Sequence, residues 1–79
     1  MESELHPGDL VEAIRARSVD VFMRESKIRV GDVGLVMQHI PLRSLHKGAY
    51  IVEVAFASGV FKFAPSNLRL LERNAGGEQ

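Results

Sequence analysis

The chain has no cysteine and no tryptophan, and it contains no long hydrophobic run. Without cysteine there can be no disulfide, no thiolate metal site and no thiol nucleophile, so the small core must hold without covalent links. No uninterrupted apolar run is longer than Val54–Ala57, which is far short of the roughly 20 residues of a membrane-spanning helix. With 46% hydrophobic and 25% charged residues, the 79-residue chain has the composition of one small globular domain.

Charge is balanced overall but unevenly distributed. Ten basic residues face ten acidic ones, which gives a formal net charge of zero. The first twelve residues contain four acids and no base, the opposite of a secretory signal, so we expect a cytoplasmic protein. Residues 13–30 contain five basic and two acidic residues, and residues 33–71 contain four basic residues and Glu53. The expected loops in these two segments are therefore basic.

Hydrophobic alternation predicts strands rather than helices. The clearest is Tyr50–Phe56, where every second residue is apolar and Glu53 falls on the opposite face. A helix stays open as an alternative for the first segment, because Glu12, Ala13 and Arg15 are good helix formers. We predict strands at Leu10–Ala16, Val30–Met37, Tyr50–Phe56, Val60–Ala64 and Leu68–Glu72, a single helical turn at Pro65–Asn67, and long loops at Arg17–Arg29 and Gln38–Ala49.

These elements together predict the fold class and the domain limits. Five short strands, a long first loop and a one-turn helix before the last strand are typical of an all-β, five-stranded SH3-like barrel. We expect residues 1–6 to form a flexible N-terminus, residues 7–72 the barrel, and residues 73–79 a disordered tail. Self-association is possible for a core of this size, and a hydrophobic strand edge at Val54–Ala57 is one place for it.

Several motifs resemble those of known small-barrel families. They are Gly8-Asp9-x-Val11, Gly31-Asp32-Val33-Gly34-x-Val36, Tyr50-x-Val52-x-Val54-x-Phe56 and Pro65-x-x-Leu68. The spacing resembles the nitrogen-fixation Z protein family, and the segment from Phe61 to Leu71 is similar to the variable chain of ferredoxin–thioredoxin reductase, to photosystem I subunit IV and to mind-bomb-type repeats. The resemblance covers residues 7–72 and implies an accessory barrel that docks on a larger protein.

One enzyme family, the type II dihydrofolate reductases, shares part of this outline. Gly8-Asp9-x-Val11 and Tyr50-x-Val52-Glu53 look like its motifs, and such a resemblance implies a tetramer around a central pore. The family's Gln-Ile-Tyr-Pro segment reads Lys62-Phe63-Ala64-Pro65 here, and its lysine falls on or near Ala13. Four Lys62 ammonium groups in one pore would repel each other, so this function is the weaker alternative.

Residues suited to catalysis or metal binding are sparse. Gly31-Asp32-Val33-Gly34 fits neither a phosphate-binding loop nor a dinucleotide motif, and we interpret it as a strand bulge or turn. His39 and His46 lie seven residues apart in the expected second loop, and the surrounding residues 38–50 contain no carboxylate that could complete a metal site. We therefore expect exposed loop histidines, no metal, no cofactor and no catalytic activity of its own.

Both expected loops combine bulky apolar residues with arginines, which favours a protein-binding surface. Phe22 and Met23 could equally close the open end of the barrel. Nucleic-acid binding is the alternative function, but it is disfavoured by the sequence pI of about 6.8. A reader of proline-rich peptides is also disfavoured, because its groove needs several exposed tyrosines and tryptophans. The predicted contact residues for a larger protein partner are Phe22, Met23, Arg24, Leu42, Arg43 and Leu45.

Overall fold

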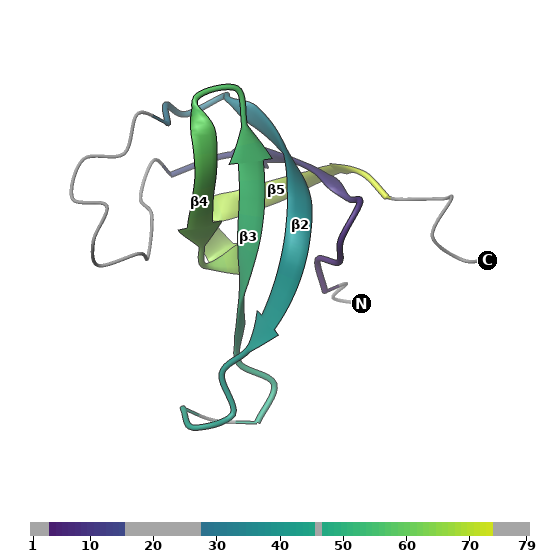
Figure 1. The fold of residues 1–79 in the computed structure, drawn as a ribbon, viewed down its shortest axis with the longest axis vertical. Helices are drawn as coiled ribbons and strands as arrows, with labels where there is room; N and C mark the ends of the chain where they lie inside the picture. Colours follow the sequence, from purple (N-terminus) through teal and green to yellow (C-terminus); the bar gives the residue numbers. More distant parts are fainter. Residues whose placement is uncertain (1–3, 16–27, 46, 74–79) are drawn as a thin grey trace.

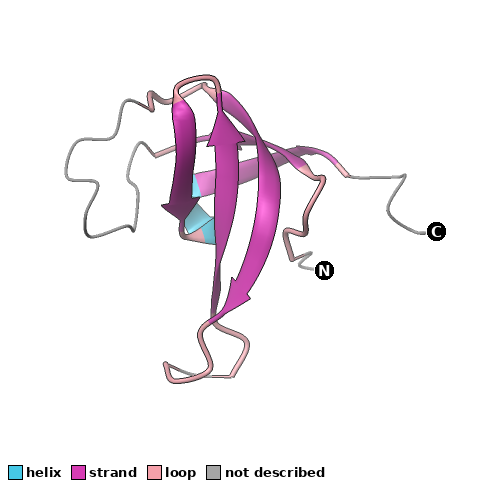
Figure 2. Ribbon diagram, in the orientation of Figure 1, coloured by secondary structure: helices cyan, strands magenta, loops and turns pink. Residues whose placement is uncertain are grey.

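The structure, a computed structural model, describes residues 4–15, 28–45 and 47–73. Within these ranges the chain forms one antiparallel five-stranded sheet with strand order β4-β3-β2-β1-β5 (Figure 1). A single 3-10 turn, η1, precedes the last strand, and the remaining regular structure is strand (Figure 2). The elements are β1 (Leu10–Ala13), β2 (Val33–Pro41), β3 (Tyr50–Phe56), β4 (Gly59–Phe63), η1 (Pro65–Asn67) and β5 (Leu68–Glu72).

The predicted all-β, SH3-like fold is confirmed, and β3, η1 and β5 have the predicted limits. The limits predicted for the other three strands were wrong. β1 ends at Ala13, and β4 is Gly59–Phe63, one residue earlier than predicted. β2 starts at Val33 instead of Val30 and continues through Gln38 to Pro41, into the predicted second loop. The extension forms because this part of β2 pairs with β3 as far as Pro41 opposite Tyr50. A register shift between Val36 and Gln38 marks a bulge, a feature that bends a strand.

Two similar turns lead into β1 and β2, one directly before each strand. In His6–Asp9 the Asp9 N–H donates to the His6 carbonyl at 3.1 Å, and the His6 N–H donates to Asp9 Oδ2 at 2.9 Å. Arg29–Asp32 repeats both bonds, each at 2.9 Å. Each turn has a glycine at its third position with φ near +100°, where other residues are strained. The Gly-Asp motifs are therefore turn motifs that position the two strands.

Gly34 allows two strands to lie unusually close together. A Cβ at this position would lie 2.6 Å from Val54 Cγ1 and 2.9 Å from the Ala55 carbonyl oxygen. Only glycine fits without moving β2 away from β3. The second glycine of the Gly31-Asp32-Val33-Gly34 motif is thus explained by packing.

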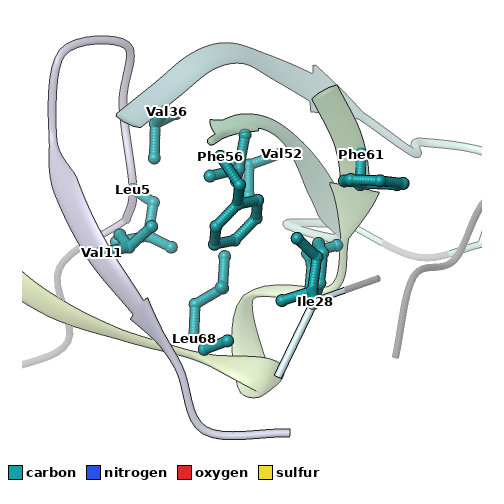
Figure 3. Close-up of a cluster of buried hydrophobic side chains, with 11 residues drawn as sticks. Leu5, Val11, Ile28, Val36, Val52, Phe56, Phe61 and Leu68 are labelled. Atoms are coloured by element: carbon teal, nitrogen blue, oxygen red, sulfur yellow. The ribbon is translucent and has the colours of Figure 1, made fainter. Parts of the chain in front are cut away.

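The core lies inside the curled sheet (Figure 3). Val11, Val36, Phe56 and Leu68 come from four different strands and point into the same interior. Leu5 is also buried there, and its N–H donates to the Tyr50 hydroxyl at 3.1 Å. The core thus includes a residue that the sequence had assigned to the flexible N-terminus. The buried hydrophobic residues are Leu5, Val11, Ala13, Ile28, Val36, Val52, Val54, Phe56, Phe61, Phe63 and Leu68.

The sheet is curled but not closed by hydrogen bonds. Over the described ranges β4 pairs with β3, β5 pairs with β1, and β4 and β5 do not pair with each other. β3 lies between β2 and β4, so the expected hydrophobic edge at Val54–Ala57 was wrong: β3 is a central strand and Val54 is buried. No helix in the described part of the chain is long and apolar enough to cross a membrane.

Candidate functional site

The connection between β2 and β3 borders an open apolar groove. The Leu42 N–H donates to the Ala49 carbonyl at 2.8 Å, and the Leu45 N–H donates to the Leu42 carbonyl at 3.0 Å. These bonds curl the loop, and Gly48, with φ of +89°, reverses the chain. The groove has a volume of about 630 Å³, within the range of sites that take small molecules or short peptide segments. It is lined by Leu42, Leu45, Gly48, Ala49, Tyr50, Ile51, Ala64, Pro65 and Ser66.

Two segments that are apart in sequence supply these walls. Residues 42–51 contribute the β2–β3 loop and the start of β3, and residues 64–66 contribute the link after β4 and the start of η1. Leu45 is 69% exposed, which is high for a leucine in a folded protein. Its side chain lies beside a groove whose walls are mainly apolar, so a ligand that covers Leu45 would remove it from water.

The loop that borders the groove is basic. Arg43 and Lys47 lie on the same loop as Leu45, and both are exposed. The sequence contains no Asp or Glu between Gln38 and Val52. The groove therefore combines an apolar surface with a positively charged border, an arrangement suited to an apolar segment with acidic neighbours.

The structure brings part of the predicted contact set together. Leu42 and Leu45 both line the groove, and Arg43 lies between them in the loop. Phe22, Met23 and Arg24 lie outside the described residues, so their contact role stays a prediction. The sequence did not predict four of the lining residues: Tyr50, Ile51, Ala64 and Pro65. Strand alternation predicts whether a side chain points inward or outward, but it does not predict which segments meet.

His39 lies in β2 and is half-buried, which corrects its assignment to an exposed loop. Its ring stacks between two others: the His6 ring centroid is 5.3 Å away at an interplanar angle of 18°, and the Tyr50 centroid is 4.3 Å away at 21°. Glu4 Oε1 lies 3.8 Å from His6 Nε2 and 3.5 Å from His39 Nε2. His39 Nε2 is buried and makes no hydrogen bond within the described structure.

The geometry of this stack does not suit a metal ion. Nitrogen lone pairs lie in the ring planes, and the planes of His6 and His39 are nearly parallel. The lone pairs therefore cannot converge on one cation at the angles that a tetrahedral site needs. In agreement, no group of three His, Asp or Glu side chains in the described ranges could hold a metal.

The buried carboxylate of Asp9 has a structural role. Arg73 Nη1 donates to Asp9 Oδ2 at 3.1 Å and to the Glu4 carbonyl at 3.0 Å, so one guanidinium ties the chain after β5 to the segment before β1. Asp9 Oδ2 also accepts the His6 N–H. Asp9 Oδ2 therefore accepts one backbone hydrogen bond and takes part in one ion pair. Together these contacts hold the segment before β1 against the chain after β5.

The fold places this protein in the class of five-stranded SH3-like barrels. The chain matches no protein-family model, no curated protein and no solved structure. Its functional interpretation therefore rests on the geometry of the groove and on the chemistry of its rim.

Proposed function

We propose that the protein is a non-catalytic accessory module that docks on a larger protein through the groove between the β2–β3 loop and η1. The observation that carries this proposal is the apolar groove of about 630 Å³ with the 69% exposed Leu45 at its side. Large exposed apolar side chains that adjoin a concave apolar surface are typical of interaction sites. The resemblance to small barrels that dock on larger proteins supports the same function.

The partner segment is expected to be apolar and to have acidic neighbours. Burying the side chain of Leu45 would contribute about 2 kcal/mol to binding. Arg43 and Lys47 are exposed at the rim, where charges mainly raise the rate of association and make it depend on salt. Affinity is thus expected to come from the groove, with the loop cations selecting for acidic flanks.

Affinity capture from the native cell extract tests this function. Tagged wild-type protein is compared with Leu45→Asp and with the control Leu71→Asp, which changes another exposed leucine that does not line the groove. We expect a defined protein to stay bound to the wild type and to the control through a high-salt wash. The Leu45→Asp variant should lose it, since removal of a central contact costs about 2 kcal/mol or roughly 30-fold in affinity.

Two outcomes would contradict the proposal. One is retention of the same partner by Leu45→Asp at the wild-type level. The other is recovery of nucleic acid that is released as salt rises, which would assign the loop cations to phosphate contacts. The reductase alternative has a separate readout, since it requires a tetramer with turnover of dihydrofolate.

A further inference from the structure

Tyr50 belongs both to the docking groove and to the end of the core. It lines the groove, and its side chain packs against the buried hydrophobic residues. Its hydroxyl accepts the Leu5 N–H at 3.1 Å, and its ring stacks on the His39 ring with centroids 4.3 Å apart. A tyrosine side chain has two torsion angles that set its position. The stack restrains the plane of the ring and the hydrogen bond restrains its far end, so both angles are restrained in the free protein.

The stack on Tyr50 continues to the segment before β1. The His6 ring lies on the His39 ring with centroids 5.3 Å apart and planes that differ by 18°. The three rings of His6, His39 and Tyr50, here called the ring column, thus run from this segment to the groove. Leu5, next to His6 in sequence, is buried in the core at 5% exposed. The segment therefore contacts Tyr50 twice: Leu5 bonds directly to its hydroxyl, and His6 contacts its ring through His39.

The segment before β1 is itself anchored to the rest of the barrel. The Gly8 N–H donates to the Val36 carbonyl at 2.8 Å, and the Val36 N–H donates to the Asp9 carbonyl at 2.9 Å. At the other end of the segment, Arg73 donates to the Glu4 carbonyl at 3.0 Å. Because both ends are fixed, the residues between them have defined positions from which they can hold the ring column.

A groove wall that is already fixed binds a partner more tightly than a mobile wall does. Fixing one mobile side chain on binding costs enough free energy to weaken affinity about two- to tenfold. A side chain that is held in the free protein avoids this cost. Because affinity differences at one interface lie mostly in the dissociation rate, a mobile Tyr50 would release the partner faster.

We propose that the segment before β1 is a positioning element of the docking groove, and that it acts through the ring column and the Leu5–Tyr50 hydrogen bond. This inference rests on the proposed docking function and adds what sets the affinity of the groove. His6 and His39 are positioning residues, because neither is among the lining residues and both act through Tyr50. A change that detaches the segment weakens partner binding although every residue of the groove is unchanged.

The dissociation rate of the partner recovered by affinity capture tests the positioning role. His39→Ala removes the middle ring and should raise this rate about two- to tenfold. His39→Phe keeps a ring between His6 and Tyr50 and should restore the wild-type rate. His6→Ala shortens a 55% exposed side chain at the end of the column, so it should act in the same direction with little effect on the core. All variants are compared at a temperature at which their circular dichroism spectra equal that of the wild type.

Amide hydrogen exchange at Leu5 is a second measurement, and it needs no partner. The Leu5 N–H should exchange about two- to tenfold faster in His39→Ala than in the wild type, because a mobile Tyr50 hydroxyl opens their hydrogen bond. In His39→Phe the exchange rate should equal that of the wild type.

The outcomes separate this inference from the docking function. The positioning role is overturned by unchanged Leu5 exchange in His39→Ala, by a wild-type dissociation rate in both alanine variants, or by a His39→Phe variant that behaves as His39→Ala does. If Leu45→Asp still loses the partner in the same experiment, the docking groove stands without the positioning role. Retention of the partner by Leu45→Asp instead contradicts the docking function, and this inference fails with it.

Discussion

The replacement Gly34→Ala is expected to destabilise the protein strongly, because the added methyl group has no space. Its carbon would lie 2.6 Å from Val54 Cγ1, 2.9 Å from Phe56 Cδ1 and 2.9 Å from the Ala55 carbonyl oxygen. Two of these neighbours are side chains and can shift. The third is backbone of β3, which is held by pairing with both β2 and β4. Relief therefore requires β2 to move away from β3 at this point.

The size of the effect follows from two opposing contributions. Overpacking a well-packed core costs about 1–3 kcal/mol, and contact with a backbone atom favours the upper end. Replacing glycine also reduces the freedom of the unfolded chain, which returns about 0.4–1 kcal/mol. The net loss should be about 2 kcal/mol, which corresponds to a fall of about 8–16 °C in Tm for a domain of this length.

Urea and thermal unfolding of Gly34→Ala, followed by circular dichroism, measure this loss. Gly48→Ala is the matched control, because a Cβ there meets nothing within 4 Å and only the positive φ of +89° is unfavourable. That control should lose about 1 kcal/mol. Adding Val54→Ala to Gly34→Ala removes one contact and leaves the backbone contact in place, so it should not restore stability. A Gly34→Ala variant that loses less than about 0.5 kcal/mol would refute the packing argument.

Two further predictions concern the segment before β1 and its contacts. Asp9→Ala should lower the free energy of unfolding by about 3 kcal/mol, since it leaves Arg73 and the His6 N–H without their buried acceptor. The control Asp32→Ala, in the corresponding exposed turn, should lower it by about 1 kcal/mol. Equal losses in urea unfolding would contradict the role assigned to Arg73. His39→Phe keeps an aromatic ring in the stack and removes a buried nitrogen that has no hydrogen bond. The free energy of unfolding should therefore stay unchanged or rise by about 1 kcal/mol. A loss above about 1 kcal/mol would show that the imidazole is needed.

The start of β3 is one wall of the docking groove. Tyr50 and Ile51 both line the groove there. The same Tyr50 stacks on His39 and accepts the Leu5 N–H, so the groove is supported by the segment before β1.

Local features of the sequence were sufficient to predict most of the strands. The alternation in Tyr50–Phe56 requires only a period of two, and Pro65 marks a chain turn before β5. The Gly-Asp motifs predict turns, because glycine adopts positive φ and aspartate bonds to nearby backbone. These preferences act over a few residues, so they can be read without knowledge of the tertiary structure.

Tertiary structure decided the features that depend on strand register and curling. β2 extends to Pro41 because β3 supplies partners, and His39 is half-buried because the segment before β1 brings His6 and Glu4 to it. The groove forms where residues 42–51 and 64–66 meet. Alternation along each strand determined which side chains point outward. Only the pairing of strands determined which of them adjoin.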